Sequence, residues 1–408
     1  MGIREATKEY ESWLRASLPM VIDDDLAFKH DQMASGVFPF LRATFYRWAP
    51  RWQELCPHLN EAPKILGVGD LHVENYGTWR DAEGRLVWGI NDFDEACELP
   101  YSADLVRLAT SVVLAVAGHH LTTPLNDAAE AILSGYEEGL HRGGRPFVLA
   151  EHHAELRRLA SEGRDAVRFW TKMEALPLAD GDYPVAAVQA LLADLPAGAV
   201  APSNGPGPDP VGGTTVGVAH GGDHGTERSG TGGAEGGAVS AGISAPRVAP
   251  ASVRTRRAGL GSLGRPRLVA LAHLHGSLVA REVKALLPSA WDWASGEPDS
   301  EVRYGRIIAG AVRDSDPGTS IQGSWVLRRL APDCSRIELA DLPAERDEAL
   351  LLHAMGAELA NVHLATPGAL GAVLDDLAHR RQHHPGWLAA AAQTMADDTD
   401  HDWNSWRH

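Results

Sequence analysis

The chain has 408 residues, of which 44% are hydrophobic and 22% are charged, and its formal net charge is -17. This composition is typical of a globular protein with enough length for two or three hydrophobic cores. The negative charge argues against a broad nucleic-acid-binding surface, and three distant cysteines without a C-x-x-C pair argue against a disulfide framework or a zinc knuckle. We therefore expect a cytoplasmic protein that does not bind nucleic acid.

The first part of the chain, residues 1–202, combines helical patterns with one short β-rich stretch. Apolar residues recur every three or four positions over residues 25–50, which predicts a helical opening. Two short apolar runs typical of strands follow, "KILGVG" and "RLVWGI", and the turn signal "RDAEG" lies between them, so residues 73–91 are predicted to form a β-hairpin. The most apolar run, residues 108–117, is shorter than the roughly 20 residues that cross a bilayer. We expect it to form a buried core helix of a protein without membrane partners.

Residues 203–250 separate this part from the rest of the chain. Gly, Pro, Ser and Thr dominate them, and large apolar side chains are almost missing. Such a segment cannot bury enough surface to offset the entropy lost on ordering, so a disordered linker is predicted. Strand-like alternation over residues 251–335 predicts a small β-rich part, and residues 336–408 are predicted to be helical. The expected fold class is therefore α+β.

Oxygen-bearing side chains cluster around the predicted hairpin. Asp70 and Asn75 lie on the loop that leaves the first strand, and Asp92 ends the strand that returns beside it. A hairpin brings these positions together, and Asp94 points to the same side if the backbone stays extended. Magnesium prefers hard oxygen ligands of this kind. The alternative is a network of aspartates and asparagines that only cap turns.

The stretches "GDLHVEN" and "INDFDEA" resemble the catalytic and metal loops of the aminoglycoside and choline phosphotransferase branch of the protein-kinase-like superfamily, whose pattern is G-D-x-H-x-x-N and then I-D-F-G/D. The downstream "LPYSADLVRLATS" is similar to the helix start that follows those loops. The resemblance implies that Asp70 is the base that receives the acceptor proton. It also implies that Asn75 and Asp92 bind Mg²⁺, with Asp94 as a further candidate ligand, and that Asp104 braces the catalytic loop.

The stretch "AGLGSLGRPRLVAL" resembles the loop that covers the nucleotide phosphates in this superfamily, and its candidate residues are Gly259, Gly261, Ser262 and Gly264. The stretch "LVAREVKAL" resembles the strand that carries the lysine for the α- and β-phosphates, which implies this role for Lys284. Glu301, seventeen residues later, is the candidate for the helix glutamate that fixes this lysine. Further on, "LLHAMGAELANVHLAT" is similar to the helix that precedes the catalytic loop.

These parts occur in a rotated order, because the catalytic loop precedes the phosphate loop along the chain. The resemblance therefore implies a circularly permuted, protein-kinase-like fold with a small β-rich nucleotide lobe and a larger helical lobe. The overall order of these parts and phrases such as "NDFDE" and "DLVRLATS" also resemble an uncharacterised bacterial family, known as domain of unknown function 2252. That family supplies no substrate.

The function expected from the resemblance is ATP-dependent transfer of a phosphoryl group to an unidentified hydroxyl-bearing acceptor, with ATP and Mg²⁺ in the site. A second class is a nucleotide-binding module without catalysis, a pseudokinase. A third is a metal-dependent phosphoesterase, which would need further Gly-Asn-His and histidine-bearing metal motifs that the sequence lacks. The sequence carries no signal for an oligomeric state.

Overall fold

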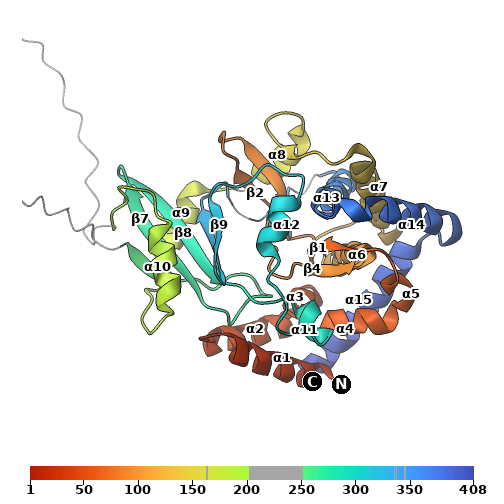
Figure 1. The fold of residues 1–408 in the computed structure, drawn as a ribbon, viewed down its shortest axis with the longest axis horizontal. Coiled ribbons are helices and arrows are strands. Elements are labelled where there is room, and N and C mark those ends of the chain that lie inside the picture. The colour runs from red at the N-terminus through yellow and green to blue at the C-terminus, as the bar shows by residue number, and fades with distance from the viewer. Residues whose placement is uncertain (162–163, 202–250, 335, 337, 344–345) are drawn as a thin grey trace, which may run out of the picture.

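The computed structural model describes residues 1–161, 164–201, 251–334, 336, 338–343 and 346–408. Over these residues the protein is a mixed α+β fold with several small sheets, so the α+β prediction is confirmed. Figure 1 shows the largest sheet on one side of the molecule and most of the helices on the other. The predicted linker, residues 203–250, lies outside the described residues.

The largest sheet has five antiparallel strands in the order β6-β7-β8-β10-β9. Its strands are β6 (Ser252–Thr255), β7 (Arg267–Leu274), β8 (Ser277–Ala285), β9 (Thr319–Gln322) and β10 (Trp325–Leu330). The β7–β8 turn has positive φ at His275 (50°) and Gly276 (82°), which suits a tight hairpin. The predicted succession of strands and turns from residue 251 onward is thus confirmed.

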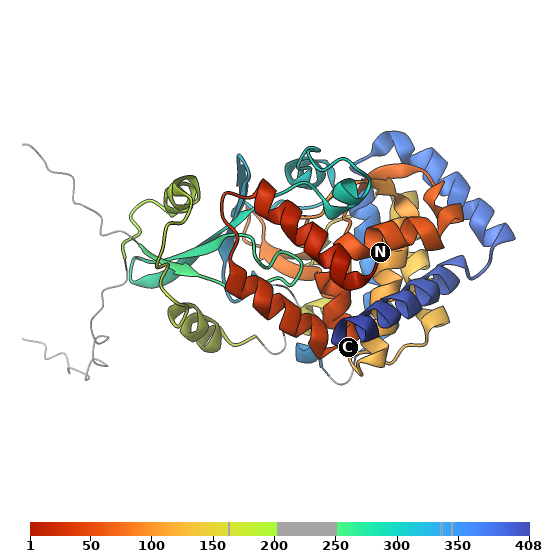
Figure 2. The same ribbon diagram turned by 90° about the horizontal axis from the view of Figure 1, so that it is seen from below.

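Two helices cover this sheet from opposite sides, as Figure 2 shows. Side chains of α9 (Ala166–Glu174) pack against an apolar patch of β7, β8 and β10, and α10 (Val185–Ala193) contacts β7 and β8. Both helices precede residue 202. The small β-rich part is therefore completed by helices from the range that the sequence assigned to the helical part.

The helical part is built around α6 (Tyr101–Ala117), which is buried along nearly its whole length, as its apolar sequence predicts. Helices α7 (Leu125–Arg142) and α13 (Glu348–His363) pack closely because glycines remove side chains from their contact: a Cβ on Gly356 would lie 2.0 Å from the Ile132 carbonyl oxygen. The part is completed by α14 (Leu370–His383) and α15 (Trp387–Arg407).

The chain opens with a run of helices: α1 (Ile3–Ser17), α2 (Asp23–Ser35), α3 (Val37–Ala43), α4 (Phe45–Leu55) and α5 (Pro57–Asn60). The first and last helices are in contact, since Arg4 Nη2 donates to the Trp406 carbonyl oxygen at 2.5 Å and both chain ends lie together in Figures 1 and 2. None of the helices in the described ranges has the length and apolar character needed to cross a membrane.

The predicted hairpin forms from β2 (Tyr76–Arg80) and β3 (Leu86–Ile90), with Gly84 at φ 75° in its turn. The strand before it, β1 (Lys64–Gly67), pairs instead with β4 (Cys97–Pro100), and β5 (Phe147–Val148) joins β3. The loops β1–β2 and β3–β4 therefore emerge side by side. The remaining helices are α8 (Ala154–Ser161), α11 (Ala290–Ala294), α12 (Tyr304–Gly310), η1 (Leu339–Asp341) and η2 (Pro367–Ala369).

Candidate active site

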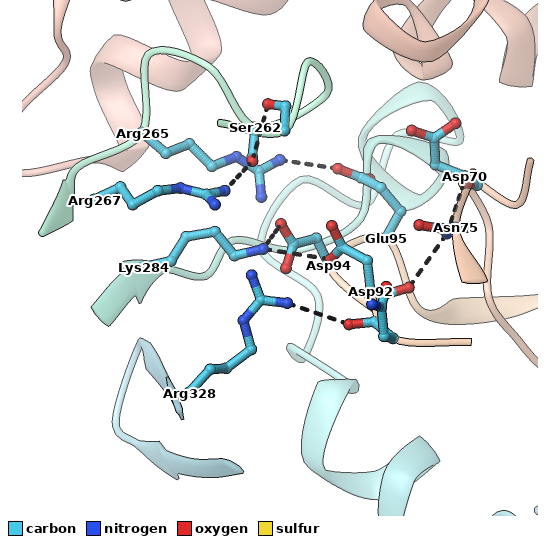
Figure 3. A network of polar contacts seen from close by, with 12 residues as sticks. Asp70, Asn75, Asp92, Asp94, Glu95, Ser262, Arg265, Arg267, Lys284 and Arg328 are labelled. Atoms are coloured by element: carbon cyan, nitrogen blue, oxygen red, sulfur yellow. Dashed lines mark hydrogen bonds and ion pairs between the residues drawn. The ribbon is translucent and has the colours of Figure 1, made fainter. Parts of the chain in front are cut away.

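A cavity of about 700 Å³ lies between the five-stranded sheet and the loops that leave β1 and β3. The helical part contributes Asp70, Asn75, Asp92 and Asp94 to its lining. The segment between β6 and β7 and the sheet contribute Gly259, Gly261, Ser262, Arg267 and Arg328. Two stretches that the sequence separates by almost half the chain thus face the same volume (Figure 3).

The β1–β2 loop is held by a carboxylate from α6. Asp104 is fully buried and accepts the backbone N–H groups of Val68 at 2.6 Å and Gly69 at 2.9 Å. The imidazole of His363, at the end of α13, lies 3.0 Å from the same carboxylate. These bonds satisfy buried backbone donors just before Asp70, so the predicted bracing role of Asp104 is confirmed.

Asp70 lies in a largely buried, charged environment. Arg107 of α6 forms an ion pair with it at 2.5 Å, and Gly261 approaches it so closely that a Cβ there would be 3.2 Å from Asp70 Oδ2. Burial raises the pKa of Asp70 above its usual range, while Arg107 opposes that shift. His72, two residues on, has its pKa held well below the usual range by burial, and its Nδ1 accepts the Glu74 N–H. Burial thus favours the protonated form of Asp70 and the neutral form of His72.

Asn75 joins the two loops, because its Nδ2 donates to the carbonyl oxygens of Asp70 at 3.1 Å and Asp92 at 3.4 Å. Both carboxylates after β3 reach the cavity, and Asp94 Oδ1 is buried without a hydrogen-bond partner among the described residues. Within those residues, no group of three or more His, Cys, Asp or Glu could by itself hold a metal ion. Hard oxygens from Asp92 and Asp94 nevertheless suit a Mg²⁺ ion that takes its other ligands from phosphate and water.

Lys284 of β8 reaches across to these acids. Its Nζ lies 3.3 Å from Asp92 Oδ1 and forms a second ion pair with Asp94, although the residues are 192 and 190 positions apart. The lysine is fully buried behind the two carboxylates. Burial lowers the pKa of Lys284, and the two aspartates oppose this shift.

The two aspartates share the lysine unequally. Burial would raise the pKa of Asp92, but Lys284 and Arg328 outweigh it and hold this pKa below the usual range. The pKa of Asp94 is raised by burial and by the neighbouring Asp92. The charged form is therefore favoured at Asp92, and the proximity of Asp92 opposes ionisation of Asp94.

Two predicted site residues lie elsewhere. Glu301 is exposed in the irregular segment before α12, which begins only at Tyr304, so its predicted pairing with Lys284 is wrong; a partner of a buried lysine has to be buried with it, and Asp94 takes that place. Gly264 packs against α2 and is not among the residues that line the cavity. Its φ is 92°, and a Cβ at this position would lie 2.5 Å from Leu26 Cδ2.

The sequence patterns did not point to a second fully buried charge of the sheet. Glu282 of β8 is 0% exposed and binds the guanidinium groups of Arg256, Arg267 and Arg328. Burial would raise the pKa of Glu282, but the three arginines hold it well below the usual range. Arg267 also donates to Ser262 Oγ at 2.8 Å, which ties the glycine-rich segment to the sheet. The available signal was the spacing of Glu282 and Lys284, two charges at alternate positions of a strand-like stretch.

Comparison with known protein families gives a match over the first part of the chain, in line with its resemblance to the uncharacterised bacterial family. Residues 22–168 match the model of a family described as "Uncharacterized protein conserved in bacteria (DUF2252)". The matched range contains the loops with Asp70, Asn75 and Asp92 and ends before the five-stranded sheet. No curated protein and no solved structure matches the chain.

Proposed function

We propose that this protein is an ATP-dependent phosphotransferase with a circularly permuted, protein-kinase-like arrangement of two lobes. The observation that carries the proposal is the contact of Lys284 with Asp92, 3.3 Å apart, at a cavity that also receives Asp70 and the glycine-rich segment. A phosphate-binding strand and a catalytic loop from distant parts of the chain then serve one substrate.

The order of the elements supports the permuted arrangement. The helix that resembles the one before the catalytic loop, α13, ends at His363, which contacts the carboxylate that braces that loop. The first and last helices touch, so the same contacts could be kept with the chain opened elsewhere. Helix α13 and the loop with Asp70 are thus close in space, whereas the corresponding elements of the superfamily are adjacent in sequence.

The cavity suits a nucleotide at its other end as well. Phe169, Met173, Leu176 and Leu330 line it and belong to one apolar cluster between α9 and the sheet. An aromatic and aliphatic surface of this kind can bury the flat face of a base, while the charged residues deal with the phosphates. The base would then lie against α9 and the triphosphate would point toward Asp92.

In the proposed reaction, the acceptor hydroxyl lies against Asp70 and its oxygen attacks the γ-phosphorus. The new P–O bond forms as the bond to the bridging oxygen breaks, ADP leaves with that electron pair, and Asp70 takes the hydroxyl proton. The raised pKa of Asp70 suits a group that accepts a proton. Asn75 and Asp92, with Asp94, would hold Mg²⁺, which when bound offsets the charge of the phosphates.

One observation favours the second candidate, a nucleotide-binding module without turnover. The glycine-rich segment lies against Asp70 through Gly261, and the ammonium of Lys29 on α2 donates to the Gly261 carbonyl oxygen at 3.3 Å. This anchoring narrows the space where an acceptor would meet Asp70. Both candidate functions include nucleotide binding, and only the first includes transfer of a phosphoryl group.

Incubation of the full-length protein with γ-labelled ATP, Mg²⁺ and panels of hydroxylated metabolites, antibiotics and proteins tests the proposal. Wild type is expected to label at least one acceptor, and Asp70→Asn to lower the rate by about 100-fold or more, since a general base contributes about 10²–10⁴-fold. Asp127→Asn, an exposed aspartate on α7, is the matched control and should keep the rate. Tight ATP binding without transfer to any acceptor would favour the non-catalytic candidate, and labelling that survives in Asp70→Asn would contradict the role of Asp70.

A further inference from the structure

Four charged side chains share one face of the five-stranded sheet. Glu282 and Lys284 are two residues apart on β8 and therefore point to the same side. Arg267 of β7 lies opposite Lys284, and Arg328 of β10 lies opposite Glu282. Residues opposite each other on antiparallel strands share a face, so the register sets these four charges next to one another. Figure 3 shows Arg267, Lys284 and Arg328 pointing from the sheet toward the acidic loops.

Positive charge exceeds negative charge around Glu282. We call Arg256, Arg267 and Arg328 the arginine cluster; Glu282 is the carboxylate that all three contact, with N–O distances of 3.4 Å for Arg267 and 2.8 Å for Arg328. One carboxylate offsets one of three charges. Lys284 carries one positive charge, and its two aspartates carry two negative charges. The three arginines, Glu282, Lys284 and the two aspartates therefore carry one net positive charge, which is concentrated on the arginine side.

The arginine cluster is accessible from the cavity. All three arginines line the cavity, and their side chains are 24%, 6% and 19% exposed, whereas Glu282 is 0% exposed. Guanidinium groups fixed by one buried carboxylate keep free N–H donors in a preset orientation. Uncompensated charge in a half-buried cavity is costly, and an anionic ligand with several oxygens removes that cost.

We infer that the arginine cluster is the polyphosphate-binding subsite of this cavity, and that Glu282 is the residue that positions it. Lys284 lies beside this subsite, where it is buried and orders Asp92 and Asp94. The ligand class is a linear polyphosphate, and its assignment to the tail of a nucleotide rests on the proposed function. Ser262, bonded to Arg267, places the glycine-rich segment over the same subsite.

Inorganic tripolyphosphate tests the subsite without a nucleotide and without turnover. Calorimetric titration of the full chain should show binding that weakens with salt, because the contact is electrostatic. Arg267→Gln and Arg328→Gln should each weaken it by about tenfold or more, since charged hydrogen bonds are lost. Arg281→Gln is the matched control. Arg281 lies directly before Glu282 on β8, but its side chain points to the opposite face and pairs with Asp194 at 3.1 Å.

Several results would overturn the inference: no tripolyphosphate binding by wild type, unchanged binding in both arginine variants, or an equal loss in Arg281→Gln. Circular dichroism establishes that each variant is folded. Where Arg328→Gln does not fold, Arg328→Lys replaces it; this variant keeps the charge and loses the planar fork, and weaker binding is again expected while unchanged binding counts against the subsite.

The same experiment separates the subsite from the proposed reaction. Asp70→Asn should bind tripolyphosphate like wild type and lose transfer. Binding that depends on Arg267 in a protein without any transfer supports the subsite and contradicts the phosphotransferase. Transfer with an unchanged KM for ATP in Arg267→Gln supports the phosphotransferase and contradicts the subsite.

Discussion

The cavity has two walls, and they balance their charges in opposite ways. The acidic wall is formed by the loops after β1 and β3, and the sheet wall by the five-stranded sheet and the segment before β7. On the acidic wall, each of three carboxylates has its own cation: Asp70 pairs with Arg107, Glu74 with Arg42, and Glu95 with Arg265. Asp92 and Asp94 share Lys284 from the other wall. On the sheet wall, three arginines share Glu282. The acidic wall thus carries surplus negative charge at Asp92 and Asp94, and the sheet wall carries surplus positive charge at the arginine cluster.

This difference assigns different partners to the two walls. A surplus of carboxylates attracts a cation, and a surplus of guanidinium groups attracts an anion. A magnesium–polyphosphate complex carries both signs and fits between them. Lys284 spans the gap, because it belongs to the sheet and its ion pairs in the described part of the chain are with acids of the opposite wall.

Removing the spanning charge should have the largest effect. Lys284→Met keeps an unbranched apolar stem but leaves Asp92 and Asp94 next to each other without their ammonium group. Loss of one partner from a buried ion pair costs about 3–5 kcal/mol. We expect a lower free energy of unfolding by about that amount in urea denaturation at pH 7, together with loss of phosphoryl transfer.

A second substitution makes this prediction specific. In Lys284→Met with Asp94→Asn, the like-charge repulsion is removed, so part of the lost stability should return. Arg15→Gln, which breaks an exposed ion pair with Asp23, serves as the control and should change stability little. Equal stability of the single and double variants would contradict the pairing between the walls.

The acidic wall also has a buried carboxyl behind it, which links stability to pH. Glu358 of α13 accepts the Ile90 N–H at 3.2 Å and the Asn361 amide at 2.9 Å, and burial raises its pKa from 4.5 to about 7. Between these values the folded state keeps a proton that the unfolded state releases, so the stabilising effect is full below pH 4.5 and is lost as pH rises to about 7. The loss amounts to about 3 kcal/mol.

Urea denaturation across pH 4.5 to 8 measures this dependence. Glu358→Gln cannot titrate, so its free energy of unfolding should change less over that range, whatever its absolute stability. Asp81, a buried carboxylate whose pKa is lowered by hydrogen bonds from Arg85, is the contrasting case. Its stabilisation is present at neutral pH and fades as pH falls, so Asp81→Asn should alter the acid side of the profile. Identical profiles for wild type and Glu358→Gln would exclude Glu358 as the cause.

The sequence predicted the two walls unequally. The acidic wall comes from one short stretch, in which a hairpin with a recognisable turn brings Asp70, Asn75 and Asp92 together, and local spacing is enough to foresee that. The helical surroundings, including buried α6, were equally visible as patterns. Strand alternation likewise predicted the sheet, and the approach of Lys284 was expected from the resemblance of its strand.

The arginine cluster could not be read in the same way. Its contacts depend on which residues lie opposite one another across three strands, and a shift of the register by one residue would move every side chain to the other face. Sequence spacing does not encode that register. Glu301 was misassigned for a related reason: the helix expected to carry it is short and begins at Tyr304, which leaves Glu301 in solvent.

A change in the pKa of Asp70 should have a smaller effect, on the pH dependence of activity. Burial raises its pKa and Arg107 opposes this, so the base form is lost as pH falls through a value above the usual range. Arg107→Gln removes the opposing charge, and the acid limb of the kcat/KM profile should move to higher pH. Arg51→Gln, which breaks an ion pair with Asp398 far from the cavity, should leave the limb in place. A limb that does not move in Arg107→Gln would mean that another group controls it.

The smallest expected effect concerns the point where the two walls touch. A Cβ on Gly261 would lie 3.2 Å from Asp70 Oδ2 and 3.4 Å from the Arg42 carbonyl oxygen, tight contacts that small shifts can relieve. Gly261→Ala should therefore cost about 1 kcal/mol or less in stability and lower transfer only severalfold, because it narrows the space for the acceptor beside Asp70. Tripolyphosphate binding at the arginine cluster should stay unchanged, and Gly371→Ala, with open space around it, is the control. If Gly261→Ala weakened polyphosphate binding and spared transfer, the glycine-rich segment would belong functionally to the sheet wall alone, and the division of the cavity into an acceptor side and a phosphate side would have to be redrawn.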